Sequence, residues 1–381
     1  MKKGILLITV FSGYNYGSSL QALAGKSILS NLGYNCQLVA MKSLVKGRDI
    51  RLKKFFTILI RSLLLYDKSG SKAWSTYQSS YAKVMIGDSV SRFTTFSDRY
   101  LEPSFLSWNA LKKAANESVA CFAGSDQIWN SAAMYVDPIY YLRFAPAEKR
   151  VALAPSFGRD FVADYNKEKM SKWISDFAYL SVREDSGVKL IKAITGKDAI
   201  QLIDPTLILN RESWVKILDI KFQKKNYILT YFLDKPSDFA KKAILDLKVT
   251  LNAEVIAIPY QFDDMSYCDK VIAAGPKEFV ELIVNAKFVC TDSFHGTAFS
   301  INMHTPFFVF EREYGSANKQ SERILSILRK VNMLNRYQPI SVVENMSLID
   351  FEYAENILDQ EREKAYRYIN NTITEIRKHE K

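Results

Sequence analysis

Histidine and cysteine are scarce in this sequence of 381 residues, with three of the first and four of the second. No pair of cysteines has the spacing of metal ligands, and the presence of only three histidines argues against a zinc site, so we expect no metal site. The cysteines stand far apart and mostly in apolar stretches, where a free thiol is typical of a small core residue. They are Cys36, Cys121, Cys268 and Cys290.

Long apolar runs are also missing. No stretch reaches the roughly 20 apolar residues that a membrane-spanning helix needs. The basic beginning, MKKGILLITVF, carries a short apolar run without a cleavage site, which is typical of a buried first strand and differs from a signal peptide. Together these absences predict a cytoplasmic protein.

Positive charge exceeds negative charge, with 52 Lys and Arg against 41 Asp and Glu and a formal net charge of +11. Such an excess favours anionic partners, which are phosphorylated metabolites, an anionic membrane surface or nucleic acid. The cations are spread widely and form no recognised nucleic-acid motif, so we expect no nucleic-acid partner. With 48% hydrophobic residues, the chain can build a large core and more than one domain.

Strand-like and helix-like segments alternate in the first half of the chain. The pattern predicts a strand at Ile5–Val10, a helix at Leu20–Leu32 that ends at Gly33, and a strand at Gln37–Ala40. This βαβ order predicts a parallel sheet with right-handed crossovers. Further strands are predicted at Val119–Ala123, Arg150–Ala154 and Tyr179–Val182.

The second half repeats this alternation, so we expect an α/β fold of two Rossmann-like domains that face a cleft. Residues 1–208 would form the first domain, with a basic helical insertion at about 42–100, and residues 209–341 the second. Residues 342–381 would be a helical segment that packs back on the N-terminal domain. Strands of the second half are predicted at Tyr227–Phe232, Glu254–Ile258, Phe288–Thr291 and Phe307–Phe310.

The stretch NYGSSLQA follows the first predicted strand almost at once. Free backbone N–H groups at a helix start attract anions and polar ligand groups, and glycine permits a close approach. Gly and Ser are also ordinary capping residues at such a turn, so both interpretations stay open. The candidate binding residues here are Asn15, Tyr16, Gly17, Ser18 and Ser19.

Two further strands end in polar turns, CFAGSDQIWN and SVREDSG. Open α/β sheets bind ligands at the carboxyl ends of their strands, which makes Asp126 and Arg183 candidates. Asp126 could instead cap a helix, and Trp129 is a core anchor. The planar guanidinium of Arg183 suits a carboxylate or phosphate. The alternative for Arg183 is a salt bridge to one of three acids, Glu184, Asp185 and Asp204.

The stretch VCTDSFHGTAFS carries a histidine between a strand and a predicted helix start. A lone histidine is more often structural, but His295 stands immediately before Gly296 and Thr297. Backbone N–H groups and the helix dipole at this place favour a phosphate. We therefore expect His295 to be functional.

In their order and spacing, these motifs resemble the polysaccharide pyruvyl transferase family. The resemblance runs from NYGSSLQA through GSDQIWN, SVREDSG, IDPTLIL and TDSFHGTAFS to SERI at residues 321–324. It implies a two-domain fold of the GT-B glycosyltransferase type. It also implies an enzyme that transfers pyruvate from phosphoenolpyruvate to two sugar hydroxyls as a cyclic ketal, with release of phosphate and with no other cofactor.

The resemblance implies roles for the candidate residues. Phosphoenolpyruvate carries a carboxylate and a phosphate, and the reaction needs a general acid and a general base. The first domain would supply the acceptor side of the cleft, with residues 15–19, and the second would contribute the donor phosphate site. Donor-binding residues would be Arg183, Ser293, His295, Gly296 and Thr297. The acid and base would come from His295, Glu184 and Asp126, with the roles among them open.

One position departs from the family pattern. Many members resemble Arg-Leu-His where this chain has Ser293-Phe294-His295, which removes an expected anion ligand. Arg312 or Arg323, farther along the chain, could compensate. Two other functions stay open: a GT-B glycosyltransferase with a nucleotide-sugar donor, and a non-catalytic glycan-binding protein.

The basic stretch 42–61 combines seven cations with apolar residues. A sugar acceptor in surface or exopolysaccharide assembly can be linked to a lipid diphosphate or to a nucleotide. The stretch could then lay a helix on the inner face of an anionic membrane, as a peripheral contact. The alternative is a solvated helix whose apolar side packs on the first domain or on a second subunit.

Overall fold

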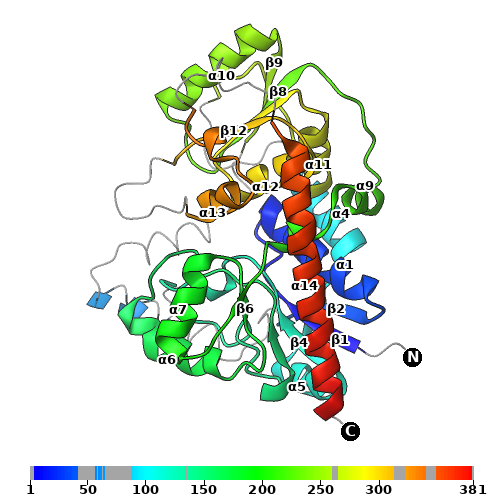
Figure 1. Ribbon diagram of the computed structural model, residues 1–381, viewed down its shortest axis with the longest axis vertical. Helices are drawn as coiled ribbons and strands as arrows, with labels where there is room; N and C mark the ends of the chain where they lie inside the picture. Colours follow the sequence, from blue (N-terminus) through cyan, green and yellow to red (C-terminus); the bar gives the residue numbers. More distant parts are fainter. Residues whose placement is uncertain are drawn as a thin grey trace.

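Two parallel sheets, each of five strands, form the frame of the protein (Figure 1). The computed structural model describes residues 4–41, 56–57, 59–61, 63–64, 87–133, 135–259, 265–312, 322–339 and 349–379. Strands of the first sheet come from the first part of the chain, and those of the second sheet come from the second part. The predicted pair of Rossmann-like α/β units is therefore present.

The first sheet has the strand order β3-β2-β1-β4-β5, and all neighbouring strands are parallel. Its central strand β1 has the sequence GILLI and is buried on both faces, as the apolar run predicts. The strands are β1 (Gly4–Ile8), β2 (Asn35–Met41), β3 (Ser104–Leu106), β4 (Ala120–Ala123) and β5 (Arg150–Ala152). Helices α1 (Tyr16–Asn31), α4 (Ser89–Phe96) and α5 (Trp108–Glu117) belong to the same half.

The second sheet has the order β10-β9-β8-β11-β12 and is also parallel throughout. Counted within its own half, this is the same order, 3-2-1-4-5, that the first sheet has. The sequence shows no internal repeat, yet the topology repeats. The strands are β8 (Tyr227–Tyr231), β9 (Glu254–Ile258), β10 (Lys270–Val271), β11 (Phe288–Thr291) and β12 (Phe307–Val309). Its helices are α10 (Asp238–Leu251), α11 (Pro276–Asn285), α12 (Phe294–Asn302) and α13 (Glu322–Lys330).

The chain crosses from one sheet to the other through two short strands and several helices. These are α6 (Asp164–Ser175), β6 (Ser181–Val182), α7 (Asp185–Thr195), β7 (Ile200–Gln201), α8 (Pro205–Ile208) and α9 (Arg211–Leu218). After α9, residues 219–226 lead into β8. In Figure 1 this segment runs from α9 along the side of the molecule to the second sheet.

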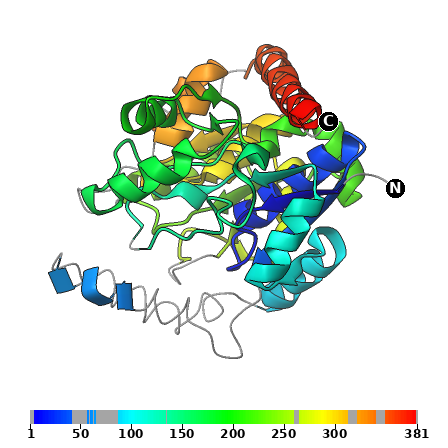
Figure 2. The ribbon, with the colours of Figure 1, turned by 90° about the horizontal axis from the view of Figure 1, so that it is seen from below.

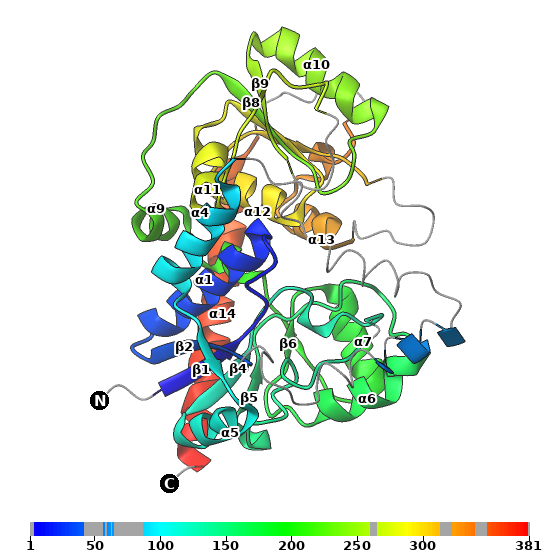
Figure 3. The same ribbon diagram turned by 180° about the vertical axis from the view of Figure 1, so that it is seen from behind.

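The last helix, α14 (Phe351–His379), runs along both halves of the molecule (Figures 1 and 3). The Tyr368 hydroxyl donates to the carbonyl of Ala152 at the end of β5, at 2.9 Å. The Arg362 guanidinium donates to Leu207 O and to Asn302 Oδ1, each at 3.0 Å. This helix therefore bonds to the first sheet, to the crossover and to a helix of the second half. The domain limits at 208 and 341 stay predictions.

The basic insertion is described only in parts. Residues 42–55 and 65–86 lie outside the described ranges. The helical pieces at 56–57, 59–61 and 63–64 lie on the face of the molecule opposite to α14 (Figure 2). Arg61 donates to Asn166 Oδ1 at 2.9 Å and to Tyr165 O at 3.0 Å, so this cation packs on the first half of the chain. None of the described helices is long and apolar enough to span a membrane.

Two helix starts differ from those that the sequence predicts. Helix α1 begins at Tyr16 instead of Leu20, and α12 begins at Phe294 instead of Gly296. In each case a polar side chain just before the helix accepts a backbone N–H and starts it early: Asn15 caps α1 and Ser293 caps α12. The predicted loop at residues 15–19 is thus a cap followed by the first helical turn.

Tyr16 joins the two halves of the molecule. Its side chain is 1% exposed, and its ring stacks on Phe279 of α11 with centroids 4.9 Å apart. Its hydroxyl donates to the carbonyl of Ala274 at 3.1 Å. Ser89 Oγ, at the start of α4, accepts from the backbone N–H of the same Ala274. We call this contact of Tyr16, Ser89, Ala274 and Phe279 the interdomain seam.

Tyr16→Ala is expected to lower the free energy of unfolding by about 3–5 kcal/mol, because the loss of a buried ring leaves a cavity. Tyr16→Phe keeps the ring and loses only the bond to Ala274, so it should cost about 1 kcal/mol. Urea denaturation followed by tryptophan fluorescence measures both values. Small and equal losses in the two variants would contradict a packing role for Tyr16.

Candidate active site

The predicted site residues meet where strands of both halves end. Asp126 follows β4, Arg183 follows β6 directly, and His295 lies four residues after the end of β11. Parallel strands present their carboxyl ends at the same edge of a sheet, which is where α/β folds bind ligands. The sequence placed these residues at strand ends, and the structure brings them together.

Arg183 is a buried cation with two acidic partners. Its Nη1 donates to Asp204 Oδ2 at 2.5 Å, and its Nε donates to Glu184 Oε1 at 3.2 Å. Burial by itself would lower the pKa of Arg183, but Glu184, Asp204 and Asp126 raise it above its ordinary value, so the group stays charged. Its guanidinium also lies 4.6 Å from the ring centre of Phe294. The salt-bridge alternative is therefore realised with two of the three acids.

The salt bridges do not use the whole guanidinium. The Nη2 atom of Arg183 is buried and has no hydrogen-bond partner among the described residues. The same holds for Glu184 Oε2 and for His295 Nε2. An unsatisfied buried polar atom is costly, and in a native structure it has a cause such as a catalytic role, a bound water or a bound ligand. Three such atoms in one cluster suit a ligand that brings both acceptors and donors.

Asp204 organises this cluster, and the sequence named it only as a salt-bridge partner. Its Oδ1 caps α8 by accepting from the N–H and hydroxyl of Thr206 at 2.9 and 2.8 Å. Its Oδ2 accepts from Arg183 and from Ser125 Oγ, the latter at 3.1 Å. Burial would raise the pKa of Asp204, but Arg183 and His295 lower it to about 2. The signal in the sequence was the IDPTLIL motif, where an Asp precedes a Pro at a helix start.

His295 lies in the first turn of α12 and is neutral at pH 7. Burial lowers its pKa from the ordinary value of 6.5, and the attraction of Asp204, whose Oδ2 lies 3.9 Å from His295 Nε2, only partly offsets this. Ser293 Oγ accepts from the N–H of Gly296 at 3.3 Å, and the first intrahelical bond is that from Thr297 to Ser293. The N–H groups of Phe294 and His295 precede that bond and are free of the helix ladder.

Gly17 sets how closely α1 can approach His295. A Cβ atom at Gly17 would lie 1.9 Å from Nδ1 of the imidazole, far inside any van der Waals contact. Only glycine therefore permits the first turn of α1 to pack against this ring. The sequence identified Gly17 as a place of close approach, and the partner is the second half of the chain.

The other residues of the first α1 turn make bonds within the protein. Ser18 Oγ donates to Asp126 Oδ2 at 2.5 Å, and Asn15 Oδ1 accepts from the Ser18 N–H at 3.0 Å. Ser19 Oγ donates to the carbonyl of Phe11 at 3.2 Å. Tyr16 is in the interdomain seam, where it contacts Ala274 and Phe279. Acceptor binding by residues 15–19 stays a prediction, with Ser18 and Gly17 nearest to the cluster.

Asp126 combines a capping bond with an unusual backbone. Its φ is 67°, in the region that disfavours side chains, and its Oδ1 accepts from the N–H of Gln127 at 2.8 Å. Strain of this kind persists where the surroundings impose it, and it gathers at functional sites. The cap interpretation and the functional interpretation of Asp126 are therefore compatible. Trp129 is fully buried and stacks on Tyr141, as expected of a core anchor.

Arg323 is the site residue that the sequence indicated least clearly. It lies on α13, is 9% exposed, and faces the cluster of Arg183, Glu184 and Asp126. With the Gln127 amide turned so that its oxygen faces the guanidinium, the two Arg323 Nη atoms donate at 3.0 and 2.9 Å. Burial first, and then the like charge of Arg183, lower the pKa of Arg323 to about 10.

Arg312, the other cation that could replace the missing family arginine, is engaged elsewhere. Its Nε donates to Asp292 Oδ2 at 3.1 Å, and its Nη2 donates to the Asp292 carbonyl at 3.0 Å. Two buried guanidiniums, Arg183 and Arg323, thus converge from the two halves of the chain. Such a pair is unfavourable without an anion between or beside them.

The space next to the cluster is small. A cavity of about 20 Å³ is bordered by Arg183, Glu184, Asp204, Phe294 and Arg323, among others. A single water molecule fills such a space. Within the part of the chain that the structure describes, no group of His, Cys, Asp or Glu is arranged to hold a metal ion.

A comparison with protein families tests the resemblance that the motifs indicate. The family model described as polysaccharide pyruvyl transferase matches residues 15–314. The chain belongs to the polysaccharide pyruvyl transferase family. The matched range contains Asp126, Arg183, Asp204 and His295, whereas Arg323 lies beyond it. Membership in this family indicates a pyruvyltransferase.

Several solved structures are similar to this chain at low sequence identity. The UDP-GlcNAc 2-epimerase of Neisseria meningitidis bound to UDP-GlcNAc has a TM-score of 0.50 and 8% identity, over 98% of this chain and 100% of that one. The S. aureus MnaA–UDP structure has a TM-score of 0.44 and 13% identity, over 98% of each chain. The E. coli heptosyltransferase WaaC, with ADP-2-deoxy-2-fluoro heptose, has a TM-score of 0.36 and 12% identity, over 84% of this chain and 95% of that one. Together with the two parallel five-stranded sheets, the similarity to the Neisseria structure confirms the predicted GT-B-like fold of this pyruvyltransferase. A search of curated proteins found no match.

Gly17→Ala is expected to lower the rate of pyruvyl transfer at least about tenfold, because the added Cβ displaces the His295 ring from its working position. Gly4→Ala serves as a matched control. A Cβ at Gly4 meets nothing nearer than Ser118 Oγ at 3.7 Å, so this variant should keep the wild-type rate. Steady-state kinetics and thermal denaturation of both variants check this. A fully active Gly17→Ala protein would show that the close approach has no part in turnover.

Proposed function

We propose that this pyruvyltransferase moves pyruvate from phosphoenolpyruvate to two hydroxyls of a sugar, as a cyclic ketal, during surface or exopolysaccharide biosynthesis. The observation that carries the proposal is the buried cluster of Arg183, Arg323 and His295. Two guanidiniums and a helix start suit a small molecule with a carboxylate and a phosphate. The family membership supports the pyruvyl group, and the cationic cluster supports an anionic donor.

In the proposed reaction, a proton adds to the methylene carbon of phosphoenolpyruvate and leaves an oxocarbenium-like centre. The first sugar hydroxyl attacks this carbon and loses its proton to a base. The carbon–oxygen bond to phosphate then breaks, and phosphate leaves with the electron pair. The second hydroxyl attacks the same carbon, loses its proton and closes the ketal ring. The sum of these steps is phosphoenolpyruvate plus a diol giving a ketal and phosphate.

The proposed proton-transfer groups are His295, Glu184 and Asp126. The neutral imidazole of His295 can accept the proton of an attacking hydroxyl, since its pKa is lowered in the ligand-free protein. A donor with negative charge would raise that pKa on binding and help the ring to hold the proton. Glu184, which pairs with Arg183, and Asp126, whose charge acts on His295, are proposed to complete the acid–base set.

In this proposal the donor's anionic groups lie between Arg183 Nη2, Arg323 and the N–H groups at the start of α12, near Ser293, Gly296 and Thr297. Arg323 then supplies the cation that the family places two residues before the histidine. The acceptor sugar would lie against the first turn of α1, on the side of Gly17 and Ser18.

The carrier of the acceptor is proposed to be a lipid diphosphate or a nucleotide. In the insertion, several large apolar side chains of the described residues are exposed, from 43% at Leu59 to 72% at Leu64. This supports a peripheral contact with the inner face of a membrane, for a protein otherwise in the cytoplasm. Arg61 supports the packing alternative, because it bonds to α6.

A second candidate is a glycosyltransferase with a nucleotide-sugar donor. One observation favours it: the Neisseria structure of similar fold is bound to UDP-GlcNAc. A glycan-binding protein without catalysis is the third candidate. Thermal denaturation with added ligands separates the three. Stabilisation by phosphoenolpyruvate alone supports the proposal, stabilisation by UDP-sugars alone supports the second candidate, and no shift with either leaves the third.

Arg323→Gln is expected to weaken phosphoenolpyruvate binding by about tenfold to a hundredfold, because charge-assisted hydrogen bonds contribute about 1.5–3 kcal/mol. The same change should leave the melting temperature equal or higher, since the lowered pKa of Arg323 means that the fold disfavours its charge. Isothermal titration calorimetry and thermal denaturation measure both effects.

Arg329→Gln, on the same helix, is the matched control. Arg329 is half exposed and pairs with Glu322 at the surface, so donor binding should not change. A drop in stability of Arg323→Gln with unchanged donor affinity would make Arg323 a structural residue and would remove it from the donor site.

The acid side of the pH profile tests His295. The value of kcat/KM is expected to fall as pH drops, with a midpoint below 6.5, because protonation of the free enzyme's imidazole removes the base. His295→Gln should remove this limb and lower kcat on the order of 10²–10⁴-fold. His304→Gln, a partly exposed histidine paired with Glu355, should leave the profile intact. An acid limb that persists in His295→Gln would belong to another group and contradict the assignment.

A further inference from the structure

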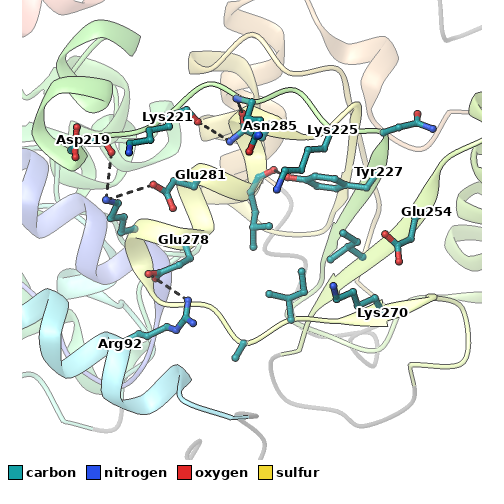
Figure 4. Close-up of a pocket in the computed structure, with 17 residues that line it drawn as sticks. Arg92, Asp219, Lys221, Lys225, Tyr227, Glu254, Lys270, Glu278, Glu281 and Asn285 are labelled. Carbon is teal, nitrogen blue, oxygen red and sulfur yellow. Dashed lines mark hydrogen bonds and ion pairs between the residues drawn. The ribbon is translucent and has the colours of Figure 1, made fainter.

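A second and much larger cavity lies away from the catalytic cluster. It has a volume of about 670 Å³, which is within the usual range for small-molecule sites. Its walls are the segment 219–226, helix α11, the edge strand β10 and Arg92 of helix α4 (Figure 4). Tyr227 and Glu254, the first residues of β8 and β9, also line it. We call this space the linker cavity, because residues 219–226 link the two sheets.

The linker cavity is separate from the proposed donor site. Tyr227 and Glu254 begin their strands, whereas His295 follows the end of the parallel strand β11. The two places therefore lie toward opposite ends of the second sheet. The lining residues of the cavity include none of the candidate catalytic or donor-binding residues.

Three lysines at the cavity have no acidic partner. Among the described residues, no carboxylate oxygen lies within ion-pair distance of Lys221, Lys225 or Lys270. By contrast, Arg92 pairs with Glu278 at 3.5 Å. In Figure 4 the amino groups of Lys225 and Lys270 extend toward the middle of the cavity from different walls. Converging unpaired ammonium groups on two walls suit an anion such as phosphate.

The floor of the cavity is apolar. Tyr227 and Ile256 are almost fully buried, and Ile272 and Leu282 lie beside them. The Tyr227 hydroxyl is already engaged, since it donates to the Leu282 carbonyl at 2.7 Å. Ile272 and Leu282 are only partly buried and present more apolar surface to the cavity. Glu254, at the rim near Lys270, can accept hydrogen bonds from hydroxyls (Figure 4). An apolar floor, a hydroxyl acceptor and two ammonium groups match a ring compound with a phosphate group.

The linker cavity also adjoins the contact between the domains. The segment 219–226 is fastened to the end of α11: the Gln223 N–H donates to Asn285 Oδ1 at 2.6 Å, and Asn285 Nδ2 donates to the Lys221 carbonyl at 3.1 Å. Ala273 lines the cavity, and its neighbour Ala274 belongs to the interdomain seam. A ligand here would contact the linker and the back of the seam together.

We propose that the linker cavity binds a phosphorylated sugar or nucleoside, whose phosphate lies between Lys225 and Lys270 and whose ring lies on Ile272 and Leu282. Bound there, the ligand favours one arrangement of the two domains and so couples to the catalytic cluster on the far side of the seam. The inference stands on the cavity alone and does not rest on the identity of the pyruvyl donor.

Isothermal titration calorimetry with uridine monophosphate, glucose 1-phosphate and inorganic phosphate tests the site on the full chain. At least one of the two ring phosphates should bind at least about tenfold more tightly than inorganic phosphate. The double variant Lys225→Gln/Lys270→Gln should weaken this binding at least about tenfold, since it removes both charge-assisted contacts. The double control Lys189→Gln/Lys242→Gln makes the same charge change at exposed lysines outside the cavity and should bind as the wild type does.

Two further measurements separate the linker cavity from the catalytic cluster. Arg323→Gln, which changes the donor site, should keep the affinity for the ring phosphate. A bound ring phosphate should change the affinity for phosphoenolpyruvate or the rate of transfer in the wild type, and this change should vanish in Lys225→Gln/Lys270→Gln.

Four results would overturn the proposal. The first is that none of the three probes binds at about 10 mM, and the second is that inorganic phosphate binds as tightly as the ring compounds. The third is that the lysine control loses as much affinity for the ring phosphate as Lys225→Gln/Lys270→Gln does. The fourth is that only Arg323→Gln loses this affinity. The last result would place the ligand in the catalytic cluster. None of them bears on whether phosphoenolpyruvate is the donor.

Discussion

The buried ion pair between Asp204 and Arg183 is the interaction on which the catalytic cluster depends. A carboxylate and a guanidinium inside a protein each lose several kcal/mol of hydration, and only close pairing with further hydrogen bonds offsets that loss. Asp204 meets this condition, because Ser125 and Thr206 bond to the same carboxylate. The pair therefore keeps Arg183 fully charged and holds one edge of its guanidinium, while Nη2 stays available. The position of Arg183 in turn defines where an anion can bind.

The second constraint is steric, and it comes from the opposite half of the chain. Helix α1 brings Gly17 against the ring of His295, and Tyr16, one residue earlier, is fastened to Ala274 and Phe279. Adjacent residues thus have different roles. Tyr16 holds the two domains together, and Gly17 leaves room for the His295 ring against helix α1. Ser18 bonds to Asp126 one residue later. A single helical turn connects the packing between the domains to two groups of the catalytic cluster, His295 and Asp126.

Much of the frame could be predicted from the sequence, because buried parallel strands are continuous apolar runs and each is followed by a polar turn. The strands at Glu254–Ile258 and Phe288–Thr291 have the predicted limits, and Asp126, Arg183 and His295 were found as the polar residues after such runs. Helix starts were harder. The sequence around Tyr16–Ser19 and Phe294 has few features that favour a helix. These residues are helical because Asn15 and Ser293 cap the first turns. Arg323 stands in an amphipathic helix of ordinary appearance, and only the meeting of two distant segments makes it a second buried cation. The linker cavity likewise had no signal, since its lining residues come from several separate segments between 219 and 285 and from Arg92, far earlier in the chain.

Helix α14 contacts both halves of the molecule, and its place late in the chain affects how the protein folds during synthesis. It follows both sheets in the chain, and its side chains bond to Ala152, Leu207 and Asn302, which lie in the first half, the crossover and the second half (Figure 3). During synthesis on the ribosome, each sheet can emerge and fold before this helix exists. Helix α14 can stabilise the arrangement of the two sheets only after both sheets have left the exit tunnel. The nascent protein therefore passes through a stage with two folded halves and an unbraced junction, at which a chaperone or a misplaced neighbouring chain finds exposed apolar surface.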